Sequence, residues 1–228
     1  MSNIKELRAA IQNKDFEAAS NIFAASKPDI EGLRNLSTAF MFLSFVFRYP
    51  ADVYESLGEV LPEFERFIRE YAGEVMSLGN KRLMEQDYVR LFINSFGGMK
   101  ANPYVSSRLD SEKLLWGDKM LRLKEMMASE GLAMGEGNAE LEDHVAVVLE
   151  FCSLLTAKAV PEGERCSMGS VLSLLEITRD FFPVMAGSFA DDVINGAESD
   201  FYKTSGKLLK NFISEADGVL DELLFPAS

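Results

Sequence analysis

Apolar residues in this chain recur at helical spacing, and no run alternates for long enough to indicate a strand. In the most apolar stretch, residues 39–47, Phe40, Leu43 and Phe47 lie three or four positions apart, which places them on one face of a helix. Leucine, alanine and methionine together number 59, whereas valine, isoleucine and threonine number 27. The β-branched side chains lose more rotamer freedom in a helix than the unbranched ones. The sequence therefore predicts an all-α fold.

Prolines and glycines divide this pattern into about ten helices. The 228 residues are enough for one large domain, and area scaling predicts that about 70% of the unfolded surface becomes buried. We therefore expect a single-domain helical bundle over residues 1–228. The expected helices cover residues 3–26, 29–48, 51–59, 62–77, 79–94, 111–130, 139–159, 164–181, 183–194 and 198–225.

Two connections differ from the short joints elsewhere in the chain. Residues 94–110 form a long loop, and loops of this length in compact helical domains are usually functional or mobile. Residues 131–138 contain three glycines and separate the N-terminal from the C-terminal half, so they are a candidate hinge. A hinge would allow a domain-swapped dimer, whereas an ordinary surface loop would leave a monomer. Both interpretations remain open.

Charge and residue inventory exclude several classes of function. The formal net charge of −13 argues against binding to nucleic acid or to an anionic membrane, because both require a basic face. The most apolar run covers about half of a bilayer span, so no direct membrane insertion is expected. Two cysteines and one histidine allow neither a disulfide framework nor a four-cysteine or histidine-rich metal site. No targeting segment is recognisable, which predicts a cytoplasmic protein.

The segment Glu140-Leu141-Glu142-Asp143-His144 is the first candidate site. It opens a predicted helix, and acidic residues in a first turn complement the helix dipole, which is the structural interpretation. The functional interpretation is that Glu140, Asp143 and His144 line a groove and receive a cationic ligand. An Asp–His pair can also perform acid–base catalysis, although no nucleophile or metal ligand accompanies it here.

The long loop contains the second candidate site, formed by Pro103, Tyr104 and Ser106, and Tyr88 lies on the helix before it. Tyrosine and serine exposed on a loop make an adaptable contact surface. Alternatively, Tyr104 pins the loop to the core. Three of the eleven methionines lie on the predicted helix 111–130, where they either fill the core or form a plastic peptide groove.

Taken in order, these motifs resemble the TorD/DmsD/NarJ family of cytoplasmic redox-enzyme maturation chaperones. The resemblance covers roughly residues 33–225 and leaves residues 1–28 as an extra N-terminal helix. A tryptophan common in the family before a late F-P element is absent here near residue 182. Among the family's motifs, the E-x-x-D-H stretch corresponds to residues 140–144 and the L-x-F helix to residues 149–151. The Y-x-x-L-F helix end corresponds to residues 88–92, the P-Y-x-S loop to residues 103–106 and the final F-Y…L-L helix to residues 201–209.

The resemblance implies a chaperone without catalytic turnover. Such a protein binds the N-terminal leader, typically of twin-arginine type, on the apo-form of a redox enzyme's catalytic subunit. Binding assists cofactor insertion and prevents premature export. The client would carry a molybdenum cofactor, and the chaperone itself would carry none. The resemblance implies that the leader is bound by Glu140, Asp143, His144, Phe151, Tyr88, Pro103, Tyr104 and Ser106.

Elementary chemistry agrees with a cationic, partly apolar ligand. Guanidinium groups pair with carboxylates, which Asp143 and the neighbouring acids supply, and an apolar segment needs an apolar groove. Because Asp143 and His144 stand at the expected start of a helix, outside its apolar stripe, we expect them to contribute more to binding than to folding. The alternatives are a helical enzyme that uses Asp143 and His144 as an acid–base pair and a helical adaptor without a peptide site.

Overall fold

The computed structural model describes residues 2–13, 15–94, 96, 98–109, 118–132, 141–160 and 167–226. In this part of the chain all regular structure is helical, apart from an isolated antiparallel bridge between Tyr104 and His144. The all-α prediction is confirmed. None of the described helices combines the length and the apolar character needed to cross a bilayer.

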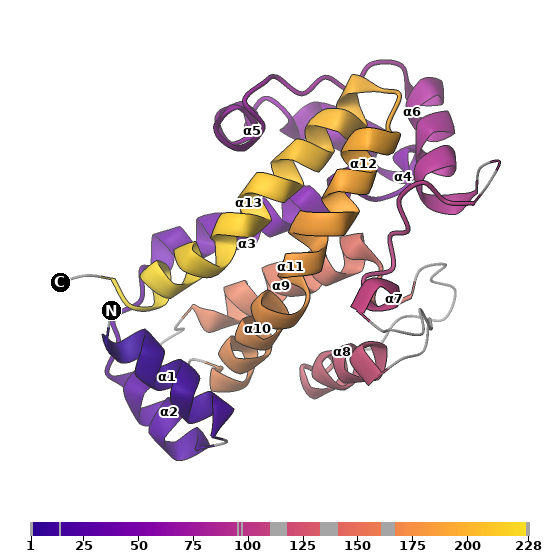
Figure 1. The fold of residues 1–228 in the computed structure, drawn as a ribbon. Coiled ribbons are helices and arrows are strands. Elements are labelled where there is room, and N and C mark those ends of the chain that lie inside the picture. The colour runs from indigo at the N-terminus through magenta and orange to yellow at the C-terminus, as the bar shows by residue number, and fades with distance from the viewer. Residues whose placement is uncertain are drawn as a thin grey trace.

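The helices form a layered bundle in which segments distant in sequence lie side by side (Figure 1). In chain order they are α1 (Ser2–Gln12), α2 (Phe16–Ala24), α3 (Ile30–Val46), α4 (Pro50–Val60), α5 (Glu65–Ala72), α6 (Lys81–Tyr88), the π-helix η1 (Val89–Ile93), α7 (Ser106–Leu109), α8 (Asp118–Ser129), α9 (Val145–Ala159), α10 (Met168–Asp180), α11 (Phe182–Val184), the π-helix η2 (Met185–Phe189), α12 (Ala190–Gly196) and α13 (Asp200–Leu224).

The centre of the bundle is the pair α3 and α9, which pack along each other. Helix α9 is apolar nearly all round and buries ten of its fifteen residues, as expected of a helix surrounded by others. Small polar residues allow the close approach: the Ser37 hydroxyl donates to the Ser153 carbonyl at 2.8 Å. The long helix α13, yellow in Figure 1, packs against α3, α5 and α12 and closes the other side of the core.

Residues 1–28 do not form the single extra helix expected from the sequence. They form a hairpin of two helices, α1 and α2, which pack against each other. The break falls at Asp15, whose carboxylate accepts the Ala18 N–H at 3.0 Å and so caps the new helix. Arg8 holds the hairpin to the end of α13 through Asp217 at 2.7 Å and Asp221 at 2.6 Å.

The helix expected over residues 139–159 begins later than predicted. Residues 141–144 form a turn, and α9 begins at Val145. The candidate hinge over residues 131–138 lies mostly outside the described residues. Of it, Gly131 has a φ of 77°, a left-handed conformation that glycine adopts without strain, and it follows the end of α8.

Candidate functional site

The two sequence motifs meet where the long loop passes the start of α9. The Val105 N–H donates to the Asp143 carbonyl at 3.0 Å, and the Val145 N–H donates to the Pro103 carbonyl at 2.9 Å. These two bonds frame the antiparallel bridge between Tyr104 and His144. The structure therefore joins the P-Y-x-S loop to the D-H dipeptide through backbone hydrogen bonds, although a long stretch of sequence separates them.

Asp143 is fully buried at this junction, with 0% exposure. Its Oδ2 accepts the Ser106 hydroxyl at 2.5 Å and the Ser106 N–H at 3.3 Å. Its Oδ1 is buried and has no hydrogen-bond partner among the described residues. Burial raises the pKa of Asp143 above its ordinary value, and the two hydrogen bonds from Ser106 oppose that shift. Asp143 thus fastens α7 to the start of α9 from inside the protein.

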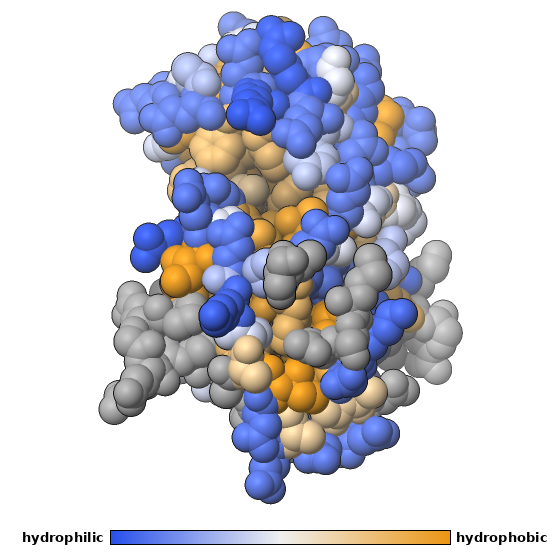
Figure 2. All heavy atoms as spheres, turned by 90° about the vertical axis from the view of Figure 1, so that its left-hand side faces the viewer, coloured by the Kyte–Doolittle hydropathy of each residue, from blue (hydrophilic) through white to orange (hydrophobic). Residues whose placement is uncertain are grey.

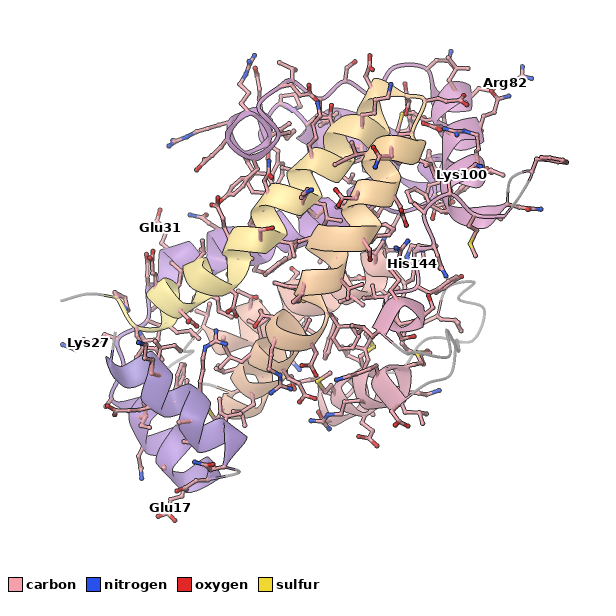
Figure 3. All side chains as sticks on the ribbon, viewed as in Figure 1. Glu17, Lys27, Glu31, Arg82, Lys100 and His144 are labelled. Carbon is pink, nitrogen blue, oxygen red and sulfur yellow. The ribbon has the colours of Figure 1, made fainter. Side chains whose placement is uncertain are left out.

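His144 is the N-cap of α9 and is 2% exposed. Its Nδ1 accepts the Ala146 N–H at 3.2 Å, so that nitrogen carries no proton. Its ring lies edge-on to Tyr104, with 5.7 Å between the ring centroids. Burial, and secondarily the positive charge of Arg48, lowers the pKa of His144 to about 3. Figure 3 shows His144 inside the bundle, near α7. The imidazole is therefore neutral at physiological pH.

The structure brings together five of the eight predicted site residues: Pro103, Tyr104, Ser106, Asp143 and His144. Their role in leader binding remains a prediction. The expectation that Asp143 and His144 contribute more to binding than to folding rested on their place at a helix start, outside its apolar stripe; the structure buries both side chains.

The other three predicted residues lie away from this junction or outside the described residues. Glu140 lies outside the described residues. Tyr88 is 2% exposed and belongs to an aromatic cluster, with ring centroids 4.9 Å from Phe92 and 5.3 Å from Tyr49. Phe151 lies on α9 beyond the joined motifs and reaches a surface groove.

That groove, with a volume of about 410 Å³, lies among α3, α8 and α9. We call it the α9 groove. Methionines from two helices, Met41 and Met127, contribute to its walls, which suits a surface that adapts to different apolar side chains. Its lining is predominantly apolar and consists of Met41, Met127, Leu132, Val147, Glu150, Phe151, Ser153, Leu154 and Ala157.

One ion pair stands at the edge of the α9 groove. The Arg48 Nη2 donates to the Glu150 Oε2, and the two side chains are 38% and 45% exposed. Glu150 is the middle position of the L-x-F motif at residues 149–151, and the sequence pattern predicts no role for it or for Arg48. No sequence signal could have paired them, because 102 positions separate them.

A second cleft, of about 490 Å³, lies between α3 and α5 and is lined by Phe64, Phe67, Glu63 and Glu70 among others. Figure 2, which faces the side that carries α5, shows apolar side chains in a hollow between hydrophilic ones. This cleft contains none of the predicted site residues. Within the described residues, no group of three or more histidine, cysteine or acidic side chains is placed to hold a metal ion.

Comparison with known proteins identifies the family. Residues 51–195 match the family model described as the nitrate reductase delta subunit, which is more than half of the chain. The protein therefore belongs to this family, the TorD/NarJ family of redox-enzyme maturation chaperones.

Individual relatives agree with the family. The chain is 33% identical over 76 residues to the chaperone protein TorD of Psychrobacter sp. (strain PRwf-1), a match that spans 33% of this chain and 34% of the relative. The match thus covers about a third of that curated relative's length. The fold is similar to a crystal structure from Archaeoglobus fulgidus described as a candidate redox enzyme maturation protein. The TM-score is 0.54 and the identity 24%, covering 78% of this chain and 93% of the other.

Proposed function

We propose that this protein is a cytoplasmic chaperone that binds the N-terminal leader of a redox enzyme's catalytic subunit in the α9 groove. The observation that carries the proposal is the position of this groove. It is an apolar groove on α9, the helix whose start is built from the two joined motifs of the family. Bound there, the leader would be withheld from export while the client's molybdenum cofactor is inserted.

The physical properties of the groove suit such a ligand. A leader that combines arginines with an apolar stretch needs an apolar surface beside a negative charge. The α9 groove supplies Met41, Phe151 and Leu154 for the apolar stretch and has Glu150 at its edge. The net charge of −13 attracts a cationic peptide over a longer range. The resident aromatic and methionine side chains tolerate variation in the apolar part.

The geometry gives no support to acid–base catalysis by Asp143 and His144. The Asp143 carboxylate accepts its hydrogen bonds from Ser106, and the His144 Nδ1 accepts a backbone N–H. Both residues are buried, and a histidine pKa of about 3 lies far from the value near the working pH that suits a general base or acid.

Co-purification from the native host tests the proposal. The tagged protein should retain the catalytic subunit of an oxidoreductase with its leader intact. Ala157 is exposed on α9 and lines the groove, so Ala157→Arg should block the groove and repel a cationic leader without disturbing the core. The same substitution at Ala51, which is exposed on α4, is the matched control.

The outcomes separate the candidate functions. Loss of the subunit with Ala157→Arg, and retention with Ala51→Arg, supports binding in the groove. Equal retention by both variants would contradict the groove. Complete absence of an oxidoreductase subunit from the wild-type preparation would favour the adaptor instead.

A further inference from the structure

The α9 groove contains a single charged group. Of the described residues that line it, Glu150 alone is charged, and the others are apolar apart from Ser153. A lone carboxylate beside an apolar surface favours ligands that carry a positive charge at the matching position. A ligand without that charge would partly desolvate the carboxylate and leave it unpaired, which makes its binding free energy less favourable. Glu150 is therefore the group best placed to distinguish one apolar segment from another.

Glu150 already has a partner within the chain. Arg48 follows the end of α3, and one nitrogen of its guanidinium donates to the Glu150 carboxylate. This contact imitates the one that a cationic ligand would make. Both side chains remain more than a third exposed, so the pair is accessible to a competing cation, and exposed ion pairs of this kind contribute little to stability.

The guanidinium of Arg48 is incompletely satisfied in this position. Its Nε is buried and has no acceptor among the described residues, although an unpaired buried donor is unfavourable. Its positive charge also acts on the buried ring of His144. Arg48 thus lies between the joined motifs and the groove. The folded protein loses little stability when the guanidinium leaves Glu150 for solvent.

We propose that Glu150 is the specificity-determining residue of the α9 groove and that Arg48 is its resident counter-ion, which a cationic side chain of the bound segment displaces. The inference rests on the proposed function and specifies its ligand: an apolar peptide segment with an arginine or lysine beside it. The exchange replaces one ion pair with another, so charge at the groove stays balanced throughout binding.

Two synthetic peptides test this proposal. The first carries two adjacent arginines before an apolar run. The second replaces both arginines with citrulline, which has nearly the same shape and no charge. Affinity is measured by titration against wild type, Glu150→Gln and Arg48→Met. Glu31→Gln and Arg34→Met are the matched controls, since both residues are exposed on α3 and Figure 3 places Glu31 well away from His144.

We expect wild type to bind the arginine peptide at least tenfold more tightly than the citrulline peptide. Glu150→Gln should abolish that preference and leave citrulline binding unchanged. Arg48→Met should tighten the arginine peptide several-fold, because it removes the competitor and leaves Glu150 unpaired. Neither matched control should alter either affinity.

Three other results would contradict all or part of the inference. Equal binding of both peptides by wild type and by Glu150→Gln would overturn the inference while leaving the proposed function intact. If Arg48→Met weakened both peptides alike, Arg48 would be a structural or ligand-binding residue, and the displacement would be wrong. If neither peptide bound the wild-type protein, binding of leaders in the groove would fail, and the inference would fail with it.

Discussion

Two acidic residues near the start of α9 behave in opposite ways. Asp143 is fully buried, holds Ser106 through both its hydroxyl and its N–H, and has a pKa raised by burial. Glu150, two turns further along, is half-exposed at the α9 groove and pairs with Arg48. Asp143 is a named position of the E-x-x-D-H motif, whereas Glu150 occupies the variable position of the L-x-F motif. Of the two carboxylates, only that of Glu150 is exposed at the surface.

A buried motif and an exposed groove are thus separate features of the same helix. The D-H dipeptide and the P-Y-x-S loop hold each other in place from inside, and by doing so they position α9. The groove that α9 lines then presents side chains such as Phe151 and Glu150. Motif residues of the family can therefore be buried and still position the helix that lines a surface groove.

Removing the buried contact between Asp143 and Ser106 should destabilise the protein at neutral pH. Asp143→Ala leaves the Ser106 hydroxyl and N–H without their acceptor inside the protein, which costs about 1–3 kcal/mol of unfolding free energy. For a chain of this size, each kcal/mol lowers the melting temperature by about 2–4 °C. Urea denaturation of Asp143→Ala, Ser106→Ala and the double variant measures the coupling between the two residues. An unchanged melting temperature in Asp143→Ala would show that this buried carboxylate contributes no more to stability than the exposed Glu150.

Acid should destabilise the protein through His144. The pKa of His144 is lowered to about 3 in the folded protein, whereas the unfolded chain binds a proton near pH 6.5. Stability therefore falls as pH drops from 6.5 towards 3, by up to about 1.4 kcal/mol per pH unit. The raised pKa of Asp143 acts in the opposite direction.

The histidine contribution is isolated by His144→Asn, which retains a side-chain acceptor for capping α9. Unfolding by urea at pH 7, 6 and 5 should show a steeper loss in wild type than in this variant. Because the chain has one histidine, parallel pH profiles would show that folding leaves the pKa of His144 unchanged.

Salt should slow peptide association at the α9 groove and leave the buried contact between Asp143 and Ser106 unaffected. Exposed charges are screened beyond about 8–10 Å near physiological ionic strength, so the association rate of the arginine peptide should fall several-fold as salt rises. A residual affinity should remain from the apolar lining. Stopped-flow measurements at low and high salt, with the citrulline peptide as the control, test this expectation. Salt-independent association of the arginine peptide would leave the acidic surface with a solubilising role alone.

The smallest expected effect is that of Glu150→Gln on stability. An ion pair as exposed as that between Arg48 and Glu150 contributes about 0–1 kcal/mol, and the glutamine preserves shape and helix propensity. The unfolding free energy of Glu150→Gln should match that of wild type within about 1 kcal/mol. A loss comparable to that of Asp143→Ala would show that Glu150, too, is a structural residue.

The fold class and the order of the main helices follow from local patterns in the sequence. Apolar spacing and proline positions act within a few residues, so they predict an element such as α3 or α13 without knowledge of its neighbours. The same local patterns gave the wrong helix start where a side chain caps backbone N–H groups. Asp15 divides the expected first helix because it caps the start of α2. His144 is the N-cap of α9, so that helix begins only at Val145.

The composition of the candidate site depends on contacts between residues far apart in the sequence. The Ser106–Asp143 contact joins residues 37 positions apart, and the Arg48–Glu150 pair joins residues 102 positions apart. Neither spacing carries a periodic signal, because packing of whole helices brings these residues together. The sequence could name Asp143 and Phe151 as members of motifs, but their burial and the exposure of Glu150 follow from how α3, α8 and α9 pack around the groove.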